Sequence, residues 1–418
     1  MGAYKQMRAD EVIKNAEFEL SELYKKLDET ALFNQDKVLK SFQKFKVAQR
    51  HFAGTTGYGY DDIGRDTLCN VYADIFKSEK ALVSPNIVSG THALTIMLFG
   101  ILRPNDNLLA ISGQPYDTLN DVLIGDDVGS LKDFGVNFDK IDLLTDTDDT
   151  PKFDLDKIKD YITTKGAKAV FIQRSRGYNW RQALSCAEIS LVCKMIKQVS
   201  PKTVILVDNC YGEFVEKTEP IEIGADVIAG SLIKNAGGGF APTGGYIAGY
   251  EKYITQISYR LTASSIGNEV GSYSYGYLPF YQGLFMAPTT TKNALKCSVL
   301  FAKCFSLLGF STMPKSNHIP YDIVTSINFD KEEQLIAFCR SIQYASPIDS
   351  NLTLEPWDMP GYQNQVIMAA GTFIQGASIE LSADSPIKAP YIAYLQGALT
   401  YEHAKISAKF ALESIIEK

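Results

Sequence analysis

The sequence lacks the features that mark membrane proteins, nucleic-acid-binding proteins and metalloproteins. Its apolar stretches fall well short of the ~20 residues that span a membrane. Its formal net charge of −7 argues against nucleic acid as the main partner. Its four histidines, at positions 51, 92, 318 and 403, are scattered and form no metal-ligand cluster. We therefore expect a small molecule as the partner, with no membrane, nucleic acid or bound metal.

Cysteine is also sparse, and its spacing favours free thiols. The seven cysteines contain no Cys-x-x-Cys pair. Cys186 and Cys193, like Cys297 and Cys304, have the spacing of two turns on one helix face, which is typical of buried thiols in a reducing compartment. The N-terminus has no signal-peptide pattern and begins with an amphipathic helical pattern, Ala9 to Leu27. We expect a cytoplasmic protein.

The patterns that are present alternate between strand and helix. Between residues 82 and 248, short apolar runs are separated by helical patterns such as 187–199. Such alternation predicts an α/β fold with a mostly parallel sheet sandwiched by helices and with ligands at the carboxyl ends of the strands. With 418 residues, 45% of them hydrophobic, the chain is long enough for one large domain and a smaller one.

The last part of the sequence predicts a smaller α+β domain. Strand patterns cover 321–329, 365–372 and 377–382, and a helical pattern runs from Tyr391 to Ile416. We therefore divide the chain into an N-terminal helical segment with an inter-subunit arm, a large domain and a small C-terminal domain, over residues 1–60, 61–290 and 291–418.

Lys234 is the most informative residue of the chain. It directly follows the buried-strand pattern 226–233 and precedes a glycine-rich loop, 235–245. A lysine held there partly desolvated has a lowered pKa, which yields the neutral amine that forms a Schiff base. A second strand pattern ends in Asp208, 26 residues upstream. An acid and a lysine at the ends of two strands are the pair that pyridoxal phosphate (PLP) requires. Taken singly, a lysine there is more often a solvated loop residue and such an aspartate a turn residue.

Two further features surround this pair. Ser89-Gly90-Thr91 precedes an apolar helical pattern, so its backbone N–H groups and hydroxyls suit a phosphate, with Ser231 as a further donor. The same residues also fit an ordinary helix N-cap. Tyr116 follows the next strand pattern, where its ring can cover the cofactor and its phenol can carry a proton. A tyrosine packed on the core is the alternative.

The order of these features resembles the fold-type I PLP enzymes of cysteine and methionine metabolism. Four stretches resemble one branch in particular, the methionine gamma-lyase-related or aluminium-resistance proteins, which are cystathionine beta-lyase-like; they are residues 57–68, 89–93, 173–178 and 237–246. The similarity extends from about Val12 to the C-terminus. It implies the PLP-dependent transferase fold type I, with the cofactor in the large domain.

The resemblance implies a role for each matched residue. Lys234 holds the PLP aldehyde as an imine, Asp208 pairs with the pyridine nitrogen, and Tyr116 stacks on the ring. The phosphate is held by Ser89, Gly90, Thr91 and Ser231.

Two departures from the related enzymes concern charge. Their Tyr-x-Arg segment crosses from the neighbouring subunit to the phosphate, and the matching Tyr58-Gly59-Tyr60 lacks the arginine. The resemblance still implies a homodimer or homotetramer with shared active sites, in which Tyr58 and Tyr60 reach the partner's cofactor. Lys388 stands in the late segment where an arginine would grip the substrate carboxylate, although lysine cannot make a bidentate pair. Arg174 and Arg176 are the other candidates.

We therefore predict a PLP-dependent carbon–sulfur lyase of the methionine gamma-lyase or cystathionine beta-lyase type, which releases a thiol, ammonia and a keto acid. Lys234 would abstract the α-proton, and Tyr116 is a candidate acid for the leaving sulfur. The spacing of these residues equally fits a gamma-replacement synthase or an aminotransferase. A non-catalytic protein that binds a phosphate-bearing ligand is a further alternative.

Overall fold

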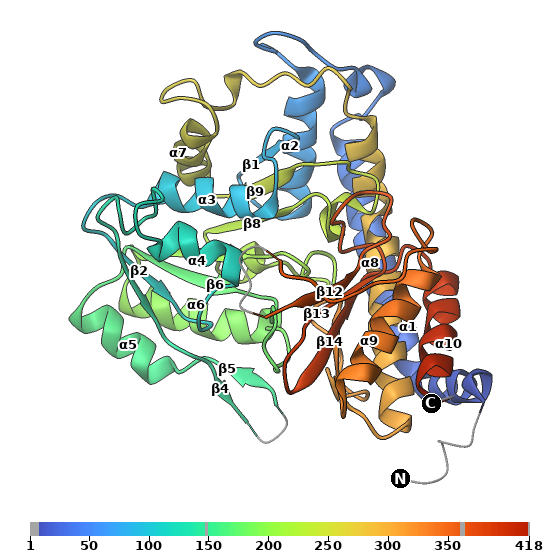
Figure 1. Ribbon diagram of the computed structural model, residues 1–418. Coiled ribbons are helices and arrows are strands. Elements are labelled where there is room, and N and C mark those ends of the chain that lie inside the picture. The colour runs from blue at the N-terminus through green and yellow to red at the C-terminus, as the bar shows by residue number, and fades with distance from the viewer. Residues whose placement is uncertain (1–7, 147–148, 360–363, 417–418) are drawn as a thin grey trace.

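The chain forms two main β-sheets joined by long helices (Figure 1). The computed structural model describes residues 8–146, 149–359 and 364–416. Within this described part, no helix is both long and apolar enough to cross a membrane.

The large sheet has seven strands in the order β1-β9-β8-β7-β6-β2-β3. The strands from β8 to β3 run parallel, whereas β9 is antiparallel to β8 and to β1. This confirms the predicted mostly parallel sheet. The strands are β1 Lys80–Ser84, β2 Asn107–Ala110, β3 Asn137–Lys140, β6 Ala169–Gln173, β7 Val204–Asp208, β8 Val227–Ser231 and β9 Gly245–Gly249.

Both faces of this sheet are buried under helices, which explains why its central strands are almost wholly apolar. Along β7, Ile205 and Val207 enter one core with α2 and α6, while Val204 and Leu206 enter another with α3 and α7. The helices are α2 Ile63–Ile75, α3 Gly90–Ile101, α4 Asp117–Ile124, α5 Leu155–Thr164, α6 Cys186–Val199 and α7 Glu251–Leu261. Short elements complete this part: β4 Leu144–Thr145, β5 Pro151–Lys152, and the 3-10 helices Gln49–Phe52, Pro220–Ile223, Asn235–Gly237 and Gly267–Glu269.

A separate antiparallel sheet forms the C-terminal domain, in the order β10-β11-β14-β13-β12. Its strands are β10 Ser311–Met313, β11 Val324–Phe329, β12 Val366–Ala369, β13 Ser382–Pro386 and β14 Tyr391–Gln396, with helices α9 Glu332–Ala345 and α10 Tyr401–Ile416.

Two predicted elements of this domain are wrong. The final helix was predicted to begin at Tyr391, but it begins ten residues later, at Tyr401, because residues 391–396 form a strand that pairs with β11. The predicted strand at 377–382 starts only at Ser382, where pairing with β14 begins.

Two long helices, α1 (Ala9–Lys44) and α8 (Leu278–Leu307), pack side by side and connect the two parts (Figure 1). Val12 near the start of α1 belongs to the C-terminal core, whereas Val38 near its end belongs to the core of the large sheet. The helix α8 runs through the predicted boundary at 290/291 without a break. The two predicted domain boundaries, at 60/61 and 290/291, stay predictions, and the N-terminal helix is shared between both cores.

Candidate active site

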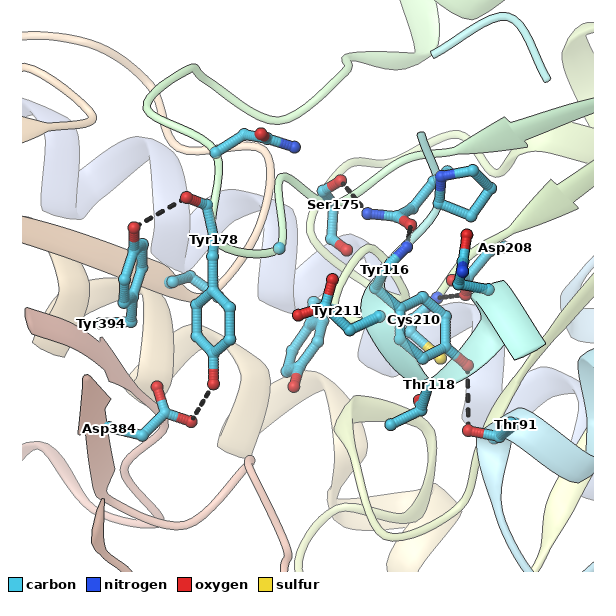
Figure 2. A pocket seen from close by; sticks show the side chains of 18 of the residues that line it. Thr91, Tyr116, Thr118, Ser175, Tyr178, Asp208, Cys210, Tyr211, Asp384 and Tyr394 are labelled. Atoms are coloured by element: carbon cyan, nitrogen blue, oxygen red, sulfur yellow. Dashed lines mark hydrogen bonds between the residues drawn. The ribbon is translucent and has the colours of Figure 1, made fainter. Parts of the chain in front are cut away.

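A pocket of about 930 Å³ opens at the carboxyl ends of β6, β7 and β8. Gln173, Asp208 and Ser231, the last residues of these strands, all line it. The opposite wall comes from the C-terminal sheet. Figure 2 shows the two walls and the residue between them: Asp208, Tyr116 and Thr91 on one side, Tyr211 in the middle, and Tyr178, Asp384 and Tyr394 on the other.

Lys234 lies in this pocket, just after β8 and at the start of the glycine-rich loop. Its Nζ is 3.9 Å from the centre of the Tyr211 ring. Tyr211 has a left-handed backbone conformation (φ 69°), which is rare for a residue with a side chain and commonly marks a functional site. This conformation places an aromatic ring beside the amine.

The pKa of Lys234 differs from the sequence-based expectation. Burial lowers the pKa of the amine, but the acidic groups around it, Cys210, Tyr211 and Asp208, together raise that pKa by a larger amount. The pKa of Lys234 therefore lies above its ordinary value. The predicted lowered pKa is therefore wrong for this pocket as it stands. The amine of Lys234 therefore carries a proton at neutral pH.

Asp208 is buried at the end of β7, beside β8. Burial raises the pKa of its carboxyl, and the nearby Lys234 amine opposes that rise. Its Oδ1 accepts a hydrogen bond from the Cys210 backbone N–H at 3.1 Å. Cys210 also lines the pocket, and burial raises the pKa of its thiol well above the ordinary value. The thiol is therefore a neutral neighbour of this carboxylate.

The predicted phosphate turn lies at the N-terminus of α3 and faces the same pocket. A Cβ on Gly90 would lie 3.2 Å from the Ser231 Cβ and 3.5 Å from the Cys210 sulfur, so a larger residue would crowd the turn. Ser89 caps the helix by accepting the His92 N–H at 3.0 Å, which is the alternative role that its position suggested. The cap leaves the turn itself open to the pocket.

Tyr116 is fixed next to this turn. Its hydroxyl is 3.0 Å from Thr91 Oγ1, and its backbone N–H donates to the Gln173 side chain at 2.9 Å. Burial and the charge of Asp208 raise the pKa of the Tyr116 phenol. The phenol therefore keeps its proton at neutral pH and is able to donate it.

Arg174 and Arg176 are both fully buried and lie outside the described lining of the pocket. Arg174 donates to Glu216 at 2.5 Å and to the Gly212 carbonyl at 2.9 Å, and Arg176 donates to Asp322 and to the Val324 carbonyl. Because these partners already hold both guanidinium groups, their placement argues against the predicted role in binding the substrate carboxylate. Of the three predicted cations, Lys388 alone lines the pocket within the described residues.

Tyr58 and Tyr60 are not among the described residues that line the pocket in their own chain. Their side chains are 70% and 62% exposed, and their rings lie 5.4 Å apart. Two backbone hydrogen bonds join the loop that carries them to the segment before α8. The Thr55 N–H donates to the Tyr273 carbonyl, and the Gly271 N–H donates to the Tyr58 carbonyl. The two rings thus point outward from a supported loop.

Several pocket residues escaped the sequence reasoning. Cys210 and Tyr211 come two and three residues after Asp208, and this closeness in sequence was the only available signal. Tyr178 ends the stretch 173–178 that carries the family resemblance, but no role was predicted for it. Asp384 and Tyr394 come from distant segments and show no motif of their own.

Comparisons with known proteins agree with this geometry. The family described as methionine gamma-lyase matches residues 9–416. An uncharacterized Bacillus subtilis protein, YnbB, is 48% identical over 405 residues, which cover 96% of this chain and 95% of YnbB. The L-methionine gamma-lyase of Treponema denticola is 22% identical over 56% of this chain and 53% of its own.

Solved structures extend the comparison. A carbon–sulfur lyase involved in aluminium resistance from Clostridium novyi is 47% identical, covers 97% of this chain and 96% of its own, and superposes with a TM-score of 0.93. The PLP-dependent protein YhfS of Escherichia coli shares the fold at 17% identity, over 94% of this chain and 97% of its own, with a TM-score of 0.61.

Proposed function

The chain belongs to the methionine gamma-lyase family, and we propose that it is a PLP-dependent carbon–sulfur lyase that acts on a sulfur amino acid. The observation that carries this proposal is that the Lys234 amine and the buried Asp208 carboxyl group line one pocket at the ends of neighbouring strands, beside the N-terminus of α3. Thiol, ammonia and a keto acid would be the products.

The pocket residues fit the cofactor. Gly90 and Ser231 leave space at the α3 N-terminus, where the N–H groups and the helix dipole favour a phosphate. The buried Asp208 would bind a protonated pyridine nitrogen, and Lys234 would bind the aldehyde. When bound, PLP supplies an electron sink that stabilises negative charge at the substrate α-carbon.

The protein's own groups would move the protons. The amine of Lys234, once displaced by the substrate amine, would take the α-proton. The ring of Tyr211 limits where that amine can point. The phenol of Tyr116 lines the pocket and is protonated at neutral pH, so it is the candidate donor to a leaving thiolate.

Lys388 is the cation that we propose for the substrate carboxylate. It is exposed at the turn between β13 and β14 and lines the pocket, whereas Arg174 and Arg176 are held in the interior. A single ammonium group binds a carboxylate as a point charge, so we expect weaker orientation than an arginine gives.

A shared site in a dimer is also part of the proposal. The loop that carries Tyr58 and Tyr60 is hydrogen-bonded to the segment that carries the 88% exposed Tyr275. Exposed aromatic residues of this kind are enriched at protein–protein interfaces. We propose that a second copy covers them and receives Tyr58 and Tyr60 at its phosphate.

Borohydride trapping and product analysis test the function. Protein loaded with PLP and reduced with borohydride should carry the pyridoxyl group on Lys234 in peptide maps. A panel of sulfur amino acids should then yield thiol and keto acid. A label on another lysine would refute the site, and amino-group transfer to a keto acid without thiol release would favour an aminotransferase.

A further inference from the structure

One side chain, Tyr211, connects the reactive lysine to the C-terminal part of the chain. It stands between the two walls of the pocket (Figure 2). The centre of its ring lies 3.9 Å from the Nζ of Lys234. Its hydroxyl lies 3.1 Å from the Ser378 hydroxyl, and the two form a hydrogen bond. Ser378 lies in the segment that leads into β13, so the ring touches the amine on one side and the C-terminal part on the other.

The backbone of Tyr211 has an unfavourable conformation in this position. The Gly212 N–H donates to the Asn209 carbonyl at 2.9 Å, so Tyr211 is the third residue of a tight turn. Its φ of 69° is the conformation that glycine or asparagine usually supplies at that place. A tyrosine there costs free energy that its contacts must offset. The contacts of the ring therefore determine where Tyr211 lies.

The partners of the ring on the C-terminal side are firmly held. Ser378 is buried, and two residues later the Glu380 carboxylate accepts the backbone N–H groups of Phe373 and Ile374, both at 2.9 Å. The Tyr211 ring also packs against a small apolar cluster drawn from α1, α8 and both parts of the chain: Leu27, Val215, Ala294, Leu295, Ile323 and Ile379. A shift of the C-terminal part would therefore move the ring.

We propose that Tyr211 is a positioning residue for the Lys234 amine and that Ser378 fixes the place of its ring. The amine nitrogen lies over the face of the ring, whose negative charge density favours a positive charge on that nitrogen. The docking of the C-terminal part is thereby transmitted to the reactive nitrogen. This inference rests on the part of the proposed function that places PLP on Lys234.

The alternative explanation is that Tyr211 only fills space between the two parts. A space-filling ring affects the stability of the protein and its uptake of PLP, but it does not act on the charge of the Lys234 nitrogen. The visible absorbance of the PLP-loaded protein reports the protonation of that nitrogen in its bond to the cofactor. The midpoint of a pH titration of this absorbance therefore separates the two explanations.

Other titratable groups act on the same nitrogen and must be kept constant. They are Cys210 and Asp208 after and at the end of β7, and Tyr116 before α4, and all three are present in every variant compared. Burial raises the pKa of Glu213 to about 8, and Lys234 is among the charges that act on it. Each titration is therefore repeated with Glu213→Gln, which removes this group from the pH range of the measurement.

The titration compares variants that remove the ring with variants that remove only its anchor. Tyr211→Leu should lower the midpoint by about 0.4 to 1.5 pH units, because the protonated nitrogen loses its contact with the ring. Tyr211→Phe keeps the ring and loses the hydrogen bond, so its shift should have the same direction and a smaller size. Ser378→Ala should match Tyr211→Phe, and the double variant should shift no further than either. The control Tyr344→Leu removes an exposed tyrosine of α9 and should keep the wild-type midpoint.

A wild-type midpoint in Tyr211→Leu overturns the positioning role. No shift in Ser378→Ala, or shifts that add in the double variant, overturns the link through Ser378, because the two changes then act on separate contacts. If Tyr211→Leu does not fold, the other variants still decide: equal shifts that do not add support the proposal, and the absence of a shift overturns it.

The lyase proposal is tested separately on the same proteins. Thiol release by the wild type leaves that proposal standing, whatever the midpoints of the variants. A PLP-loaded wild type that releases no thiol from any sulfur amino acid refutes the lyase proposal, and the titration still decides the role of Tyr211. A protein that takes up no PLP on Lys234 refutes both.

Discussion

The two ends of the pocket are built in different ways. At the strand end, Asp208, Ser231 and Lys234 lie within a few residues of the carboxyl ends of β7 and β8, so sheet topology alone brings them together. At the far end, Tyr178 lies in the loop after β6 and Asp384 lies on β13 of the C-terminal sheet, and they meet only because the two parts of the chain pack together.

The difference separates chemistry from selectivity. The strand end holds the Lys234 amine, the Asp208 carboxyl group and the predicted phosphate turn, which suit one cofactor and the reactions that it supports. The far end contributes the Asp384 carboxyl group, the Lys388 amine and the rings of Tyr178 and Tyr394, which can contact the side chain of a substrate. Variants at the strand end should therefore abolish reaction with every substrate, whereas variants at the far end should change the choice among them.

The largest effect is expected from Lys234→Ala. Removing the amine deletes both the attachment of PLP and the base for the α-proton, so the rate of thiol release should fall by at least about 10² to 10⁴-fold for all substrates. Steady-state assays of thiol release measure this. The exposed Lys252→Ala on α7 is the control and should keep wild-type rates. A loss restricted to one substrate would place Lys234 in selectivity instead.

Asp208→Asn tests the other half of the pair. An amide cannot hold the pyridine nitrogen protonated, so exchange of the substrate α-proton with deuterium, followed by NMR, should slow by roughly two orders of magnitude or more. The visible band should still show bound PLP. Exchange at a near-normal rate would mean that another group supplies the positive charge of the ring.

Mixing two inactive chains tests whether one active site uses two subunits. One chain carries Lys234→Ala and the other Tyr58→Phe with Tyr60→Phe. Random exchange makes half of the dimers hybrids, and one of the two sites in each hybrid is intact, so about one quarter of the wild-type activity should return.

The control for this experiment is mass spectrometry that proves subunit exchange. Exchange without recovery, when the double phenylalanine chain alone is inactive, would show that Tyr58 and Tyr60 act within their own chain.

The smallest expected effect is on the stability of the folded protein, through the buried Glu213. Burial raises the pKa of Glu213 to about 8, and Tyr246 donates to its Oε1 at 2.8 Å while its Oε2 has no partner in the described residues. The pKa of Glu213 is higher in the folded protein than in the unfolded protein. Its contribution to the free energy of unfolding is therefore complete below about pH 4.5 and is lost as the pH rises through about 8.

Glu213→Gln imitates the protonated acid and cannot ionise. Its melting temperature should therefore fall less between pH 5 and pH 9 than that of the wild type, by on the order of 2–4 °C, as measured by calorimetry. Identical pH profiles for the two proteins would show that Glu213 stays in one protonation state throughout this range.

Much of the strand end was predictable because local patterns carry it. Apolar runs that end in Asp208 and just before Lys234 indicate parallel strands, and parallel strands deliver their last residues to one sheet edge. The direction of the Lys234 pKa was not predictable, since burial and the charge of Asp208 act in opposite directions and only their distances decide the outcome.

The sequence by itself determined the fold class, the alternation of strands and helices, and the position of the lysine, the acid and the anion turn, because each depends on neighbours in the chain. Only the tertiary structure decided that Arg174 and Arg176 are held in the interior, that residues 391–396 pair as a strand, and that Asp384 faces the pocket. These features depend on contacts between segments that are far apart in sequence, such as Asp384 with Tyr178, and no local pattern records such contacts.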